Sequence, residues 1–180
     1  IEFFDPSSGR FEIIGELRAG AQRAFHSATL LADGRILLAG GEAITSSSKE
    51  ALASALLITI TDDGRAESEV VRMPEARTGH TAVRLADNRV VLIGGRILVA
   101  SGPQDETRHT YHTKLAVFDP EDGTGQFLNF GSGGLEGASE LRNARFGHSS
   151  TLLPSGRDIL VAGGYSGNRV IRDFEVISLL

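Results

Sequence analysis

One pattern occurs three times along the chain, and this internal repeat constrains the fold more than any other feature of the sequence. In each copy an Arg stands three positions before a His, and an apolar segment then ends in Gly-Gly. The copies are Arg23 to Gly41 (RAFHSATLLADGRILLAGG), Arg77 to Gly95 (RTGHTAVRLADNRVVLIGG) and Arg145 to Gly164 (RFGHSSTLLPSGRDILVAGG). Their spacing is unequal, so insertions must lie in the loops between them.

Each copy predicts a β-hairpin. The first strand runs from the His through Leu31, Leu85 or Leu153, and the second is Ile36–Ala39, Val90–Ile93 or Ile159–Ala162. Between them stand Asp33-Gly34, Asp87-Asn88 and Ser155-Gly156, pairs that suit the positive φ angles of a two-residue hairpin turn. The second strands are apolar at every position, which indicates burial on both faces and therefore sheets that pack on sheets.

Two further strands are expected after each hairpin. They are Ala55–Ile60 with Glu67–Val71, Leu115–Phe118 with Gln126–Phe130, and Phe174–Leu179 alone after the third copy. Glu2–Phe4 and Phe11–Ile14 form an equivalent outer pair before the first copy, and FDPSSG and FDPEDG supply turns after two of these strands. The sequence thus predicts an all-β protein of antiparallel four-stranded units.

These residues resemble kelch repeats, especially the bacterial style in which RxGHSxTLLPxGRxLVAGG precedes a strand ending in FDPxxG. The resemblance implies a kelch-type β-propeller, of which about three blades are present as an incomplete ring. The expected single domain comprises outer strands in 1–15, blades in 23–72 and 77–130, and an incomplete blade in 145–180. Such an arc would be a piece of a longer propeller, with closure by self-association as the alternative. The chain departs from the family in lacking Trp and in having Phe25 where Gly79 and Gly147 stand in the other copies.

Composition excludes several kinds of site. There is no Cys, so disulfides, thiolate zinc sites and cysteine nucleophiles are ruled out for this chain. A net charge of −5 argues against a nucleic-acid partner, and no apolar run reaches the ~20 residues of a membrane helix. We therefore expect no nucleic-acid partner and no membrane insertion. The compartment stays open, although the resemblance to bacterial kelch arrays favours an exported or cell-surface protein.

The insertions point to one face of the propeller. Blade connections alternate between two faces, and the longer segments, 42–53, 96–112 and 131–144, all fall on the face that carries the second-to-third-strand and inter-blade loops. Insertions on one face often mark a binding surface. Arg23, Arg77 and Arg145 are expected to ring the axis there, where they would suit a carboxylate, a phosphate or an acidic peptide. The alternative is that each Arg pairs with a carboxylate or carbonyl of a neighbouring blade.

Other polar residues carry weaker indications. His26, His80 and His148 recur in every repeat, which favours a structural role for a buried imidazole that caps backbone groups. His109, Tyr111 and His112 in RHTYHT are candidate ligand-binding residues, although a solvated loop explains them too. Gly131–Ser139 is predicted to be a flexible linker because it lacks a phosphate-binding motif. No catalytic residue, metal or cofactor is assigned.

The leading functional hypothesis is a non-enzymatic binding module that holds a protein, a carbohydrate or an acidic ligand on the insertion-bearing face. One alternative is part of a propeller enzyme of the carbohydrate-oxidase or sugar-epimerase type, with its active-site residues largely in other blades. Another is a structural surface or adhesion repeat. The chain offers no unique nucleophile–base or metal constellation, which is why binding is preferred over catalysis.

Overall fold

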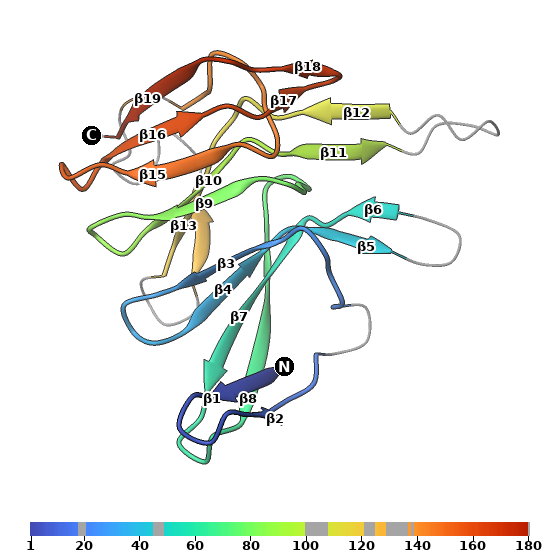
Figure 1. Cartoon of the computed structure of the whole chain (residues 1–180), viewed down its shortest axis with the longest axis vertical. Helices are drawn as coiled ribbons and strands as arrows, with labels where there is room; N and C mark the ends of the chain where they lie inside the picture. Colours follow the sequence, from blue (N-terminus) through green and yellow to red (C-terminus); the bar gives the residue numbers. More distant parts are fainter. Residues whose placement is uncertain are drawn as a thin grey trace.

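The computed structural model describes residues 1–17, 21–44, 49–99, 108–120, 125–128, 137 and 139–179. These residues form β-strands and connections, and every paired strand runs antiparallel to its neighbour. The sheets stack beside one another along the chain (Figure 1). The part of the chain described here contains no helix long and apolar enough to cross a membrane.

Three sheets correspond to the three sequence repeats. Blade 1 has the order β3-β4-β7-β8, blade 2 the order β9-β10-β13-β14 and blade 3 the order β15-β16-β19, while β1 and β2 pair separately. The bounds are β1 Glu2–Asp5, β2 Arg10–Ile13, β3 Ser27–Leu30, β4 Ile36–Ala39, β7 Ser54–Ile60, β8 Ala66–Arg72, β9 Thr81–Arg84, β10 Val90–Ile93, β13 Ala116–Asp119, β14 Gln126–Leu128, β15 Ser149–Leu152, β16 Asp158–Ala162 and β19 Phe174–Ser178. The all-β architecture of antiparallel blades is therefore confirmed.

The core lies between the blades. Val91, Ile93 and Val117 of blade 2 pack with Ile159, Val161 and Ile177 of blade 3. On its other face, Val90, Leu92 and Phe118 pack with Leu37, Ala39 and Leu57 of blade 1. Strand β10 is buried at every position because it has a blade on each side, whereas β4 and β16 in the flanking blades alternate between buried and half-buried. Burial on both faces is thus confirmed for β10, whereas the equally apolar β4 and β16 keep one half-buried face because each has a blade on one side only.

The predicted insertions contain strands of their own. Between the second and third strands of each blade the chain forms a small antiparallel hairpin. These hairpins are β5 Glu42–Ile44 with β6 Lys49–Ala51, β11 Arg96–Val99 with β12 Arg108–Tyr111, and β17 Tyr165–Ser166 with β18 Arg169–Val170. The sequence predicted loops in place of the first two hairpins and gave no indication of the third. Most of the predicted Gly131–Ser139 linker lies outside the described residues.

The turns inside the repeats are wider than predicted. In the first repeat Leu31 N donates to Arg35 O at 2.8 Å, which leaves three residues in the loop. Positive φ occurs at one residue of each turn, with φ 87° at Gly34, 74° at Asn88 and 76° at Gly156. The third repeat has one more loop residue, since Leu153 N donates to Asp158 O. Asp33 and Asp87 instead accept a hydrogen bond from the backbone N–H two residues later. The two-residue turn was therefore the wrong type, because only one left-handed position is needed.

Phe25 occupies a left-handed backbone position that the other repeats give to Gly. Its φ is 55°, against 63° at Gly79 and 61° at Gly147, and its side chain is 65% exposed. A side chain in this region costs about 1–2 kcal/mol. Phe25→Gly is therefore expected to raise the free energy of unfolding by about 0.5–1 kcal/mol, after the added freedom of the unfolded chain is subtracted. Urea unfolding measures this, with Phe25→Ala as the control that keeps Cβ and should give no gain. A loss of stability in Phe25→Gly would show that the ring makes a contact that outweighs the strain.

Candidate functional site

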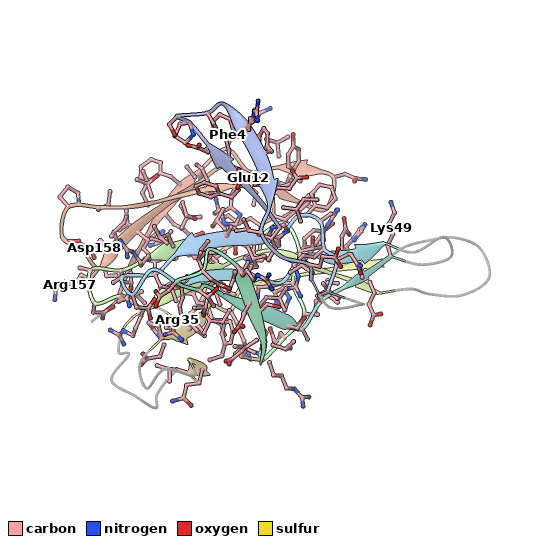
Figure 2. All side chains as sticks on the ribbon, turned by 90° about the horizontal axis from the view of Figure 1, so that it is seen from below. Phe4, Glu12, Arg35, Lys49, Arg157 and Asp158 are labelled. Atoms are coloured by element: carbon pink, nitrogen blue, oxygen red, sulfur yellow. The ribbon has the colours of Figure 1, made fainter. Side chains whose placement is uncertain are left out.

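The three small hairpins share one side of the arc. In Figure 1, β5–β6, β11–β12 and β17–β18 all project to the right, while the turns between the first and second strands of each blade lie on the left. Figure 2 shows the same division, with Lys49 on the hairpin side and Arg35, Arg157 and Asp158 on the other. The predicted alternation of connections between two faces is thus confirmed. We call the side with the hairpins the hairpin face.

The repeated arginines are buried or half-buried within their blades. Arg77 and Arg145 are 1% and 0% exposed, and Arg23 is half-buried. Each guanidinium donates to the first carbonyl of the Gly-Gly pair in its own blade, at 3.1 Å for Gly40, 3.2 Å for Gly94 and 3.0 Å for Gly163. Each guanidinium thus bonds within its own blade, because the carbonyl at the end of the second strand accepts its hydrogen bond. These hydrogen bonds of Arg23, Arg77 and Arg145 differ from the alternative, in which each Arg pairs with a carboxylate or carbonyl of a neighbouring blade. The expected ring of arginines around the axis stays a prediction.

The backbone beside these arginines joins one blade to the next. Arg77 O accepts from Gly41 N at 2.9 Å, and Arg145 O accepts from Gly95 N at 2.8 Å. A Cβ on Gly40 would lie 2.4 Å from Arg77 O, and one on Gly94 would lie 2.4 Å from Arg145 O. The glycine pairs thus permit a backbone approach between blades that no other residue allows.

The repeated histidines also connect the blades. His80 Nε2 lies 2.8 Å from Ser27 Oγ, and His148 Nε2 lies 2.9 Å from Thr81 Oγ1, so each bonds a hydroxyl of the preceding blade and not the backbone group expected. Burial, and then the charge of Arg77, lowers the pKa of His80 to about 3. Burial, and then Arg145, lowers the pKa of His148 to about 4. Both are neutral near pH 7, as a structural role requires.

His112 and His109 lie in different environments. His112 is buried, with Nε2 at 2.8 Å from Ala76 O and Nδ1 at 3.0 Å from Glu75 Oε2, so it anchors the connection between blades 1 and 2. Burial, and then the charge of Arg77, lowers its pKa. His109 lies instead beside Tyr111, with ring centroids 6.2 Å apart. Of the three candidates in RHTYHT, the structure brings His109 and Tyr111 together and separates His112 from them.

An aromatic row crosses from blade 2 to blade 3 on the hairpin face. The ring of Phe146 lies 5.6 Å from that of Tyr111, stacked at an interplanar angle of 28°, and 5.8 Å from that of Tyr165. The guanidinium carbon of Arg96 lies 4.4 Å from the centre of the Phe146 ring. Tyr165 is 47% exposed, whereas Tyr111, Phe146 and Arg96 are half-buried. We name Tyr111, Phe146, Tyr165 and Arg96 the aromatic row.

Polar atoms without a protein partner lie next to this row. Arg96 Nε and His109 Nδ1 are buried and have no hydrogen-bond partner within the described part of the chain. Glu42, only 5% exposed, acts on the same histidine: burial and Arg96 lower the pKa of His109, and Glu42 opposes them. Buried polar groups in native structures are nearly always hydrogen-bonded, so unpaired donors beside exposed aromatic rings indicate a place for a ligand or water.

Sequence reasoning found Tyr111 and His109 and missed Arg96, Phe146 and Tyr165. The missing signal is a register that recurs in the repeats. The residue after each Gly-Gly bridges to the residue just before the left-handed position, in the pairs Ala24–Glu42, Thr78–Arg96 and Phe146–Tyr165. Only the third copy places aromatic residues at both positions. Aligning the three copies at these two positions would have shown the aromatic pair of the third copy.

Comparisons with known proteins place the fold. No family model and no curated protein matches the chain. The solved structure of YjhT superposes with a TM-score of 0.72 at 16% identity, over 99% of this chain and 51% of that one. A fungal alcohol oxidase of the AA5 family, solved in complex with copper, gives a TM-score of 0.66 at 16% identity, over 91% of this chain and 33% of that one. The chain thus spans about half of the first and a third of the second, and it has the β-propeller fold.

Proposed function

We propose that the chain is a binding module that holds a carbohydrate against the aromatic row. The observation that carries the proposal is the run of three rings beside a guanidinium whose Nε has no hydrogen-bond partner among the described residues. The C–H face of a sugar ring packs on the electron-rich face of an aromatic ring, while its hydroxyls bond to nearby donors. Tyr165 offers the most exposed ring of the row, and Arg96 offers the donors.

The surrounding blades suit such a role. The hairpins that carry Arg96, Tyr111 and Tyr165 follow β10 and β16, whose buried side chains pack blade 2 against blade 3, so the rings are held by a rigid frame. We further infer that the blades are kelch repeats, on the strength of the Arg, His and Gly-Gly positions that the three copies share. Enzymes with related folds remain an alternative in view of the AA5 oxidase, but no specific group of the described residues favours catalysis over binding. A surface or adhesion repeat would be one use of a carbohydrate-binding face.

The chain carries its own reporter for this test. It has two tyrosines and no tryptophan, and both tyrosines, Tyr111 and Tyr165, lie in the aromatic row. Tyrosine fluorescence therefore reports on this site alone. We expect a saturable change when cello-, chito- or galacturonate oligosaccharides are titrated into the protein. Comparing the affinity for galacturonate oligosaccharides with that for cello- and chito-oligosaccharides also shows whether Arg96 selects for a carboxylate.

Two variants make the test specific. Tyr165→Ala removes the exposed ring and is expected to weaken binding about tenfold, the size of effect typical of an aromatic hot spot. Tyr165→Phe keeps the ring and should bind nearly as well as the parent, and Tyr111 reports in both variants. Binding that is equally strong in Tyr165→Ala, or a fluorescence that no oligosaccharide changes, would contradict the proposal.

A further inference from the structure

A cavity lies on the hairpin face beside the buried guanidinium of Arg77. Its volume is about 410 Å³, and its lining includes Glu75, Arg77, Lys114, Ala116, Ser139 and Glu140. These residues come from the two inter-blade connections that flank blade 2 and from the start of strand β13. None of them belongs to the aromatic row.

The three repeated arginines differ in their partners, and the difference isolates Arg77. Arg145 Nη2 pairs with Glu175 Oε1 at 2.7 Å and Asp173 Oδ1 at 3.1 Å, and its Nε donates to Asn143 O. Arg23 donates from Nη2 to Ser54 Oγ and from Nε to Ala21 O. The third and first blades thus supply polar partners for both ends of the guanidinium.

Among the described residues Arg77 has backbone hydrogen-bond partners only, since its Nη1 donates to Gly94 O at 3.2 Å and to Lys114 O at 3.4 Å. Its Nε is buried without a hydrogen-bond partner among the described residues, and the carboxylate oxygen nearest its Nη2 is Glu75 Oε2, at 3.9 Å. The side chain is only 1% exposed, and burial lowers the pKa of Arg77 to about 10, which Glu75 partly offsets. A charged group this deeply buried normally carries a bonded counter-charge.

The strand register shows what blade 2 has in place of those partners. Val161 pairs with Glu175 in blade 3, and Leu92, at the same place in blade 2, pairs with Ala116. Lys114 stands two residues before Ala116, as Asp173 stands two before Glu175. Blade 2 therefore replaces two carboxylates by a cation and a methyl group, and the cavity includes the space beside both residues.

We propose that this cavity binds the carboxylate of a small organic acid, which takes the place beside Arg77 that the Glu175 side chain takes beside Arg145. Arg77 supplies the fixed donors, exposed Lys114 adds charge at the rim, and Ser139 lines the same space. The acidic residues of the lining face other groups, since Glu75 Oε2 lies 3.0 Å from His112 Nδ1 and Glu140 accepts from Thr113 Oγ1 at 3.4 Å. A carboxylate is preferred to a phosphate because the equivalent guanidinium in blade 3 is matched by carboxylates.

The test is a calorimetric titration of the whole chain with succinate, against sodium chloride at equal ionic strength. Arg77 is too deeply buried to be replaced safely, so the variants change Lys114. Lys114→Gln is expected to weaken succinate binding roughly threefold to fivefold, as for a partly exposed ion pair. Lys114→Asp introduces the residue of blade 3 and should abolish binding, because its carboxylate then pairs with Arg77. Lys49→Gln, at the only other lysine, makes the same charge change elsewhere and should bind like the parent.

Three outcomes would overturn the proposal: no succinate binding by the parent chain beyond the chloride baseline, undiminished binding by Lys114→Asp, or equal weakening in Lys49→Gln. Circular dichroism of each variant checks that it is folded. The tyrosine fluorescence of the aromatic row serves as a separate readout, because the succinate site has no tyrosine in its lining. Failure here therefore leaves the carbohydrate proposal standing, and the reverse also holds.

Discussion

Gly94→Ala is expected to lower the free energy of unfolding by about 2–5 kcal/mol. The added Cβ would lie 2.4 Å from Arg145 O and 2.7 Å from His148 Cε1, and the backbone of the next blade cannot move aside cheaply. Overpacking of this kind costs about 1–3 kcal/mol. The left-handed φ of 61° at this residue adds about 1–2 kcal/mol for any side chain. Equilibrium unfolding in urea measures the loss.

Gly163→Ala is the matched control. Gly163 holds the same position in blade 3 with φ 67°, but the nearest atom to its added Cβ is Ile171 O at 4.0 Å. Only the cost of a side chain at a left-handed φ applies, so we expect the free energy of unfolding to fall by about 1–2 kcal/mol. The difference between the two variants isolates the approach of one blade to the next. Equal losses would contradict the role assigned to the glycine pairs.

Acid is expected to unfold the protein through His80 and His148. Their folded-state pKa values are about 3 and about 4, below the usual 6.5. Between pH 6.5 and each folded-state pKa, the unfolded chain therefore binds more protons than the folded chain. The stability they contribute is fully present above pH 6.5 and is lost as the pH falls toward 4. Over this interval each histidine lowers the free energy of unfolding by about 1.4 kcal/mol for each unit by which the pH falls. This loss is large beside the free energy of unfolding of a typical protein, about 5–15 kcal/mol. We therefore expect unfolding to begin at a pH above that at which ordinary carboxylates titrate.

Unfolding midpoints in urea between pH 7 and pH 4 measure this dependence. His148→Gln keeps an amide nitrogen near Thr81 and removes one titrating group, so its stability should fall less steeply with pH. His26→Gln is the control, because the His26 side chain is exposed and, unlike His80 and His148, bonds no hydroxyl of a preceding blade within the described residues. Parallel pH profiles for the parent and His148→Gln would contradict the assignment of the acid sensitivity to the buried histidines.

The sequence predicted the blades well because their signals are local. Strands β4 and β10 have the predicted bounds, and β16 begins one residue earlier, at Asp158. Apolar runs that end in Gly-Gly leave few alternatives for these segments. The hairpin β17–β18 was missed because each of its strands has only two residues, too few for a period-two pattern to be visible. The turn type was missed because Asp-Gly suits both two- and three-residue loops.

The candidate site was harder to predict because its parts come from different repeats. The aromatic row joins Tyr111 of one hairpin to Phe146 and Tyr165 of the next blade, and only the packing of the blades brings them together. The sequence shows that the three arginines form a set, but it does not show that each side chain bonds a carbonyl of its own blade. The strand register is needed to see that Lys114 of blade 2 stands at the position that Asp173 holds in blade 3.

We propose that ligands bind to the hairpin face. Amide chemical-shift mapping by NMR, with the oligosaccharide that gives the largest change in tyrosine fluorescence, locates the binding face directly. We expect perturbed amides at Arg96, Tyr111, Phe146 and Tyr165, and unperturbed ones at the turns around Gly34, Asn88 and Gly156. Perturbations confined to those turns, or spread evenly over both faces, would contradict it.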